Sequence, residues 1–316
     1  MKRSHLVAAL LAAFALSIHP SAQADTFGSG SNSFEISFVQ ISQTNNATDP
    51  ASGNRYGAVP YEYRAGKYEI TQDAITKATA SGMANVTAGP WTGNQPAATI
   101  NWYEAAAFVN FLNTNSGKTA AYNLTFSGGS WSMDLWSSEQ AWTAGGENLY
   151  RNKNAFYFLP SENEWYKAAY YNPAGSNYFL YPTASSSVPT AVASGTNAGS
   201  AVYNNAASVP AVVDSAGGLS PYGTMGQGGN VWELNESAYA GTNSSPSEAR
   251  ALRGGDWTYT EFFLRSSSSR VDFVAPSQAV DFVGFRVASV PEPSTYALVL
   301  LGAGAVYIWK RRKSSL

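Results

Sequence analysis

The alternation of apolar and polar residues predicts a small number of β-strands. Apolar side chains at every second position from Phe34 to Phe38 indicate that residues 34–41 form a strand with one buried face. Further strands are expected at residues 63–70, 231–234, 251–253 and 284–288.

A helical spacing of apolar residues predicts two clear helices. Residues 103–112 have this spacing, and Asn101 stands where an N-cap residue accepts a hydrogen bond from the first turn. Residues 161–171 begin with a capping box, in which Ser161 precedes Glu164 by three positions. Both helix starts are therefore encoded locally.

Loops are expected to make up much of the remaining chain. A short helix is predicted from Thr71. Residues 183–221 are rich in Ser, Ala, Gly, Val and Pro, which suits either a linker between domains or a long surface loop within one domain. The scattered Val and Tyr side chains of this segment favour the loop.

The N-terminus has the three parts of a secretory signal peptide. Two cations are followed by the apolar residues 6–18, and a small-x-small cleavage pattern ends at Ala24. We therefore expect residues 1–24 to be removed, so that the mature chain begins at Asp25.

The C-terminus carries a second signal. Pro291, Glu292 and Pro293 precede the apolar residues 296–309, and four cations follow at residues 310–313. As a helix, the apolar run would extend about 21 Å, less than the ~30 Å hydrocarbon core of a bilayer. A short apolar run before a basic end is typical of an anchor that is recognised and then removed.

This tail, residues 290–316, resembles the PEP-CTERM sorting signal. In that family exosortase, a membrane cysteine peptidase, processes the tail near the motif, and the host usually makes exopolysaccharide or biofilm matrix. The resemblance implies export across the inner membrane of a Gram-negative bacterium to its envelope, outer surface or extracellular matrix. Before processing, the tail would be the only contact with the membrane. An ordinary single-pass anchor is the alternative.

Net charge changes once both terminal signals are set aside. Six of the 19 Lys and Arg residues lie in them, and Glu292 is the one acidic residue there, which leaves 13 basic and 20 acidic residues in the domain. A net charge of −7 (13 minus 20) argues against a nucleic-acid partner, because no basic stripe is present to neutralise phosphates.

Residue usage excludes several classes of chemistry. The chain has no cysteine, and its two histidines, His5 and His19, both lie in the signal peptide. The mature domain therefore lacks the thiol or imidazole needed for Ser-His-Asp and Cys-His catalysis and for His-ligated zinc, copper or iron. Any chemistry that remains would use carboxylates, Lys, Tyr, hydroxyl groups, or cations held by oxygen.

Four spaced motifs resemble the formylglycine-generating enzyme (sulfatase-modifying factor) superfamily. They are residues 158–165 (FLPSENEW), 229–233 (GNVWE), 252–257 (LRGGDW) and 284–287 (GFRV), with a weaker fifth match at residues 101–106. The resemblance implies that residues 25–289 form a single α+β domain, related to C-type lectins, with many loops and little regular secondary structure.

The chain departs from this family where its redox chemistry resides. In the oxidising members two cysteines after the Gly-Gly motif bind copper, and by register these positions are Tyr259 and Leu264. Asp256 stands directly after Gly-Gly, where the family usually has a serine. The sulfoxide-synthase branch of the family uses a histidine cluster, and this domain has no histidine. No catalytic residue is therefore assigned, and we expect no copper or iron oxidation.

The resemblance also implies a calcium site. The family binds calcium around the motif at residues 229–233, which implies Glu233 with the carbonyls of Gly229 and Val231 as ligands. An Asp or Asn expected three residues before Gly229 is Gly226 instead. The alternative is that Arg286 forms a buried ion pair with an acidic residue such as Glu233 or Glu164.

Three functions follow from these observations. The first is a non-catalytic surface protein that binds extracellular polysaccharide or another envelope component. The abundant aromatic residues suit this function because their rings stack on sugar faces, although packing in the core is the commoner role of a tryptophan. The second is an oxidoreductase of the sulfatase-modifying factor type. The third is a hydrolase that uses carboxylates such as Asp256, Glu261 and Glu233.

Overall fold

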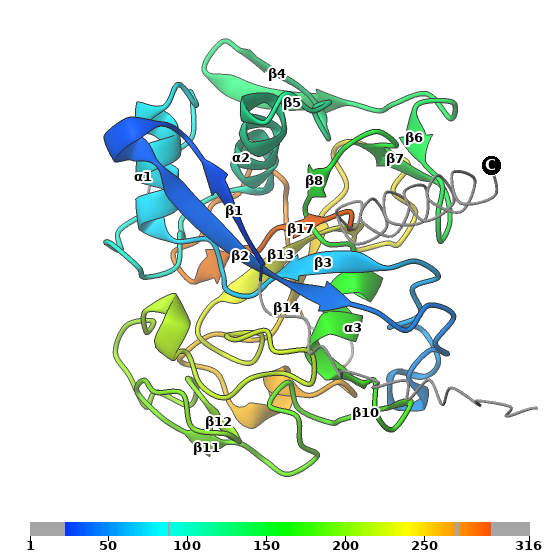
Figure 1. Ribbon diagram of the computed structural model, residues 1–316, viewed down its shortest axis with the longest axis vertical. Coiled ribbons are helices and arrows are strands. Elements are labelled where there is room, and N and C mark those ends of the chain that lie inside the picture. Colours follow the sequence, from blue (N-terminus) through cyan, green and yellow to red (C-terminus); the bar gives the residue numbers. More distant parts are fainter. Residues whose placement is uncertain (1–22, 88, 269–271, 292–316) are drawn as a thin grey trace, which may run out of the picture.

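Strands from both ends of the domain form the larger sheet. The computed structural model describes residues 23–87, 89–268 and 272–291 (Figure 1). Within them, five strands lie in the order β1-β2-β3-β17-β8, and every neighbouring pair is antiparallel. Their bounds are β1 Gln23–Phe27, β2 Phe34–Ile41, β3 Tyr63–Gly66, β17 Ala288–Ser289 and β8 Tyr157–Phe158.

A second sheet of four strands has the order β15-β14-β13-β16, in which β13 and β16 are parallel. Its bounds are β13 Trp232–Ala238, β14 Arg250–Arg253, β15 Phe273–Val274 and β16 Val283–Gly284. Two-stranded pairs complete the described sheets: β4 Asn123–Ser127 with β5 Ser130–Asp134, β6 Ala141–Trp142 with β7 Asn148–Asn152, β9 Tyr171–Asn172 with β10 Asn177–Tyr178, and β11 Thr190–Ala191 with β12 Ser200–Ala201.

The helices begin where the sequence predicts them. Helix α1 spans Gln72–Ala80 after the N-cap Thr71, and α2 spans Trp102–Asn115 after the N-cap Asn101. Helix α3 spans Glu162–Tyr170 and has the predicted capping box. Side chains that satisfy the free N–H groups of the first turn explain why these three starts could be read from the sequence.

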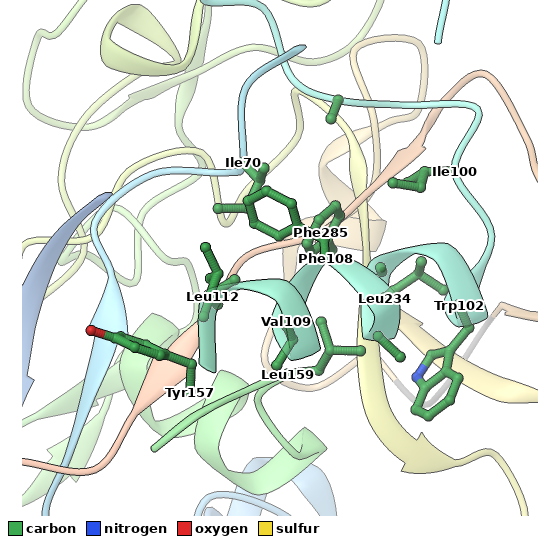
Figure 2. Packing of buried hydrophobic residues seen from close by; sticks show 14 of the residues in the cluster. Ile70, Ile100, Trp102, Phe108, Val109, Leu112, Tyr157, Leu159, Leu234 and Phe285 are labelled. Carbon is green, nitrogen blue, oxygen red and sulfur yellow. The ribbon is translucent and has the colours of Figure 1, made fainter. Parts of the chain in front are cut away.

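Helix α2 is the centre of the main hydrophobic core. Phe108, Val109 and Leu112 are fully buried on one face of this helix, and Figure 2 shows them beside Phe285 and Leu234. The rings of Phe108 and Phe285 meet edge to face at 5.7 Å. Each large apolar side chain buried in this way contributes about 1.5–3 kcal/mol to stability.

The last predicted strand is wrong in one respect. Residues 284–288 do not form one strand: β16 ends at Gly284 and joins the second sheet, whereas β17 begins at Ala288 and joins the first. Between them the chain turns Arg286 inward to a buried carboxylate, which interrupts both sheets. The strand predicted at residues 63–70 is likewise shorter and ends at Gly66.

The segment at residues 183–221 is a long loop of the same domain, as predicted. It contains β11, β12 and a short 3-10 helix, Val213–Ser215. Its backbone is tied to the rest of the domain, since Asn230 N–H donates to the carbonyl of Val202 at 2.8 Å. In Figure 1 this loop lies at the end of the molecule opposite the β4–β5 hairpin.

Arg64 fastens the two ends of the described domain together. Its terminal nitrogens donate to the Asp25 carboxylate at 3.0 and 2.6 Å, and its Nε donates to Ser289 Oγ at 2.8 Å. The hydroxyl of Tyr157 donates to the same carboxylate at 2.8 Å. This Arg64 clasp joins the residue predicted to begin the mature chain to the strand that precedes the sorting motif.

Loss of the Arg64 guanidinium would leave the Asp25 carboxylate buried without the cation that pairs with it. We predict that R64M lowers the free energy of unfolding by about 3–5 kcal/mol, the usual cost of breaking a buried ion pair. Denaturant unfolding of the purified protein measures this. The control K77M breaks the partly exposed Asp73–Lys77 pair and should cost less than about 1 kcal/mol. Equal losses in both variants would contradict the role of the clasp.

Candidate functional site

A buried ionic network lies where β7, α3 and β13 meet. Arg151 donates to both oxygens of Glu164 at 3.0 and 2.8 Å, and to both oxygens of Glu236 at 2.9 and 2.6 Å. All three side chains are at most 1% exposed. One guanidinium therefore holds two carboxylates from different elements.

The two carboxyl groups of this network respond differently to burial. Burial acts to raise the pKa of Glu164, but the opposing effects of Arg151 and the Ser161 N–H bring that pKa below its usual value. For Glu236 burial is the stronger effect, and its pKa is raised despite Arg151. Tyr122 and Asn148 donate to Glu236 at 2.8 and 2.5 Å, so its oxygens have partners.

A cleft of about 810 Å³ lies over this network. Its walls come from residues 55–61, the β6–β7 hairpin, the start of α3 and the segment after β13. This volume falls within the ~300–1,000 Å³ range of pockets that hold small ligands. Aromatic rings and amides line it, including Tyr56, Tyr61, Trp142, Tyr239, Asn148 and Asn163.

The aromatic wall of the cleft is held by the buried cations beneath it. Tyr61 and Trp142 meet edge to face at 5.2 Å. The guanidinium of Arg151 lies 5.4 Å from the centre of the Trp142 ring, and that of Arg253 lies 4.5 Å from the centre of the Tyr56 ring. Rings fixed in this way lose little conformational entropy when a ligand stacks on them.

The predicted calcium motif is engaged in another ion pair. Arg286 donates to both oxygens of Glu233 at 2.6 and 2.5 Å, and Trp165 Nε1 donates to one of them at 2.8 Å. This confirms the predicted pairing of Arg286 with Glu233, whereas Glu164 binds Arg151 instead. Arg286 itself also donates to the carbonyls of Gly66 and Met225.

These contacts do not fit a calcium centre at Gly229, Val231 and Glu233. Calcium takes six to eight oxygens, with carboxylates supplying the charge, and the Glu233 carboxylate is already occupied by a guanidinium. In the part of the chain that the structure describes, no group of three or more Asp, Glu, His or Cys side chains is placed to hold a metal ion.

Comparison with known families agrees with this fold and these motifs. A profile of the sulfatase-modifying factor enzyme 1-like domain matches residues 29–290. The chain belongs to the sulfatase-modifying factor family. A profile of the PEP-CTERM protein-sorting motif matches residues 289–313. Both resemblances predicted from the sequence are confirmed.

Two solved structures share the fold of this sulfatase-modifying factor domain at low sequence identity. Treponema denticola variable protein 1 is 22% identical, with a TM-score of 0.58 over 86% of this chain and 100% of that one. CarF is 17% identical, with a TM-score of 0.53 over 86% of this chain and 99% of that one. At these identities the likeness shows the fold alone. A comparison with curated proteins finds no match.

The PEP-CTERM motif marks the chain for export, sorting at the envelope surface and processing by exosortase. Pro291 is the last residue before the tail that the structure leaves undescribed; Glu292, Pro293 and the apolar residues 296–309 lie outside the described part. Among the described residues, none of the helices has the length and apolar character that a bilayer span requires. Cleavage between Ala24 and Asp25 stays a prediction.

Packed side chains are found at the two positions that the motif register predicts for the family's redox cysteines. The Tyr259 ring packs edge to face on Trp232 at 5.6 Å and on Phe263 at 4.7 Å, and Leu264 is fully buried. Asp256 is also buried, and one of its oxygens accepts hydrogen bonds from the backbone and hydroxyl of Thr258. These side chains serve the core of this family member, and none of them is a copper thiolate.

The carboxylates considered for a hydrolase have separate partners. Glu233 binds Arg286, and Glu261 pairs with Arg265 four residues later at 2.9 Å. Asp256 bonds to Thr258, and burial raises its pKa. Among the described residues, no hydrogen bond joins two of these three acids.

The cleft residues were not found by sequence analysis. Tyr61, Trp142 and Asn163 come from three separate segments, and only Asn163 lies within one of the family motifs. Trp142 precedes Gly145 and Gly146, which have φ values of +80° and +118° in the turn of the hairpin. In the sequence, the only sign of this tight turn beside Trp142 was the pair of glycines, because glycine adopts positive φ values readily.

Glu69 lies beside Gly226, the position at which the family resemblance implies an Asp or Asn. Gly226 has a φ of +80°, and a Cβ atom there would lie 2.8 Å from Glu69 Oε2. Asn230 donates to this oxygen at 2.8 Å, whereas the buried Oε1 atom has no hydrogen-bond partner. Burial, and then the nearby Glu233, raise the pKa of Glu69 well above its usual value.

The pKa of Glu69 makes stability depend on pH. Because this pKa is higher in the folded protein than in the unfolded chain, the contribution of Glu69 is complete below the unfolded value, near 4.3, and declines as the pH rises toward the folded value. We predict that E69Q gains stability relative to the natural protein between about pH 5 and pH 8. Thermal or urea unfolding at both pH values measures this.

Glu261 provides the control for this experiment, because it is a partly exposed carboxylate paired with Arg265. E261Q should change stability by less than about 1 kcal/mol at either pH. A difference between E69Q and the natural protein that is the same at both pH values would show that Glu69 does not titrate in this range.

Proposed function

We propose that this protein is a non-catalytic member of the sulfatase-modifying factor family that binds a polysaccharide of the cell envelope or extracellular matrix. The binding site is the cleft walled by Tyr61, Trp142 and Tyr56. The observation that carries the proposal is this rigid aromatic wall beside amide and hydroxyl groups, because sugars present apolar faces and hydroxyl edges.

Two further observations support the proposal. The mature domain has no cysteine or histidine, so it lacks the ligands for the redox chemistry of its relatives. The sorting motif directs the protein to the envelope surface, where polysaccharide is abundant in bacteria that build a matrix. A surface protein with a preformed cleft and neither cysteine nor histidine in its mature domain is suited to binding.

Loss of the Trp142 ring should abolish most of the binding. We predict that W142A weakens affinity for polysaccharide at least tenfold, since truncation of a central aromatic residue commonly costs about 2 kcal/mol or more. Isothermal titration against neutral, acidic and amino polysaccharides measures this. Y61F keeps the ring and loses the hydroxyl that donates to Glu164, and it should retain binding.

Trp131 offers a matched control. It lies in β5, outside the cleft, and its indole nitrogen donates to the Asn85 carbonyl at 2.8 Å. W131A should bind polysaccharide as the natural protein does. If the natural protein binds no member of the panel, or if W131A and W142A lose affinity equally, the cleft is not a polysaccharide site.

A further inference from the structure

The ionised groups in the floor of the cleft already have partners of opposite charge. Arg151 lies between Glu164 and Glu236, and all three are fully buried. Glu162, which also lines the cleft, accepts two hydrogen bonds from Arg253 at 2.9 and 2.6 Å. Two guanidinium groups thus face three carboxyl groups, and burial raises the pKa of Glu236, which favours its neutral form. A charged ligand group would have to compete with these buried pairs.

The rim of the cleft adds one charge of each sign. Arg55 and Glu147 are both exposed, and neither forms an ion pair with another described residue. Arg55 Nε instead donates to the Ser52 carbonyl at 3.1 Å. The two rim charges cancel, and exposed charges of this kind are screened by salt. The domain as a whole has 13 basic and 20 acidic residues, which disfavours an anionic polymer.

Neutral hydrogen-bond donors are concentrated at the start of α3. Asn163 Oδ1 accepts from Gly57 N–H at 3.0 Å, which leaves its Nδ2 group without a partner among the described residues. Ser161 and Ser237 Oγ accept from backbone N–H groups of α3 at 3.3 and 3.0 Å, so their own hydroxyl hydrogens can donate. All three side chains line the cleft.

We propose that the ligand of this cleft is an uncharged polysaccharide. This inference rests on the proposed function and names the class of glycan. Its sugar rings stack on Tyr61 and Trp142, and its hydroxyl oxygens accept from Asn163, Ser161 and Ser237. Recognition then depends on ring faces and neutral hydrogen bonds, and attraction between net charges contributes little.

Salt dependence tests the class of ligand. The full-length protein, purified in mild detergent, is titrated with a neutral glucan, with alginate and with chitosan in low and high NaCl. We expect binding to the glucan, with an affinity that changes less than twofold between the two salt concentrations. Binding to alginate or chitosan alone, lost at high salt, would overturn the neutral class while the proposed function stands. Binding to none of them would overturn both.

Three substitutions locate the recognition in the cleft. N163D keeps the oxygen that accepts from Gly57 and removes the Nδ2 donor, so we expect at least a fivefold loss of affinity for the glucan at both salt concentrations. R55Q and E147Q remove the rim charges and should each change affinity less than twofold. Unchanged binding by N163D, or a large loss with R55Q or E147Q, would overturn the assignment. Circular dichroism of each variant confirms that the fold is retained.

Discussion

The structure depends on guanidinium groups buried against carboxylates. Arg151 joins β7 to Glu164 of α3 and Glu236 of β13, Arg253 joins β14 to Glu162, and Arg286 joins the link between the two sheets to Glu233. The described chain has no disulfide, and most of its strands are short, so few long runs of backbone hydrogen bonds between strands stabilise it. Removal of one partner from such a pair leaves a buried charge uncompensated, at a cost of about 3–5 kcal/mol, so these pairs specify where the loops meet.

The same pairs shape the candidate site. Arg151 lies under Trp142 and Arg253 lies near Tyr56, so the cations that hold the sheets together also fix the aromatic wall of the cleft. Glu162 and Glu164 belong to the first turn of α3, where they oppose the positive end of the helix dipole. The family motif at residues 158–165 therefore supplies the carboxylates of the buried ion pairs, and its residues 161–163 line the cleft.

The chain has the fold of its family, and packed side chains occupy the positions where the motif register predicts reactive groups. Tyr259 and Leu264 pack in the core at the positions of the redox cysteines. At the predicted calcium motif, Arg286 supplies the positive charge that faces Glu233, and Glu69 fills the space beside Gly226. The Glu233 carboxylate is thus paired with a guanidinium, and Tyr259 and Leu264 are held by apolar packing.

Features that depend on local chemistry or on composition could be predicted from the sequence. Caps at Asn101 and Ser161 specify the helix starts because their partners lie three residues away, and the absence of thiol and imidazole groups from the domain follows from counting. The sequence also predicted an acidic partner for Arg286, Glu233 or Glu164, and the structure shows that it is Glu233. Three features became visible only in the folded domain: the separation of β16 from β17, the Arg64 clasp between residues 25 and 289, and the cleft. These features join segments up to more than two hundred residues apart, and no local pattern specifies which distant segments will meet.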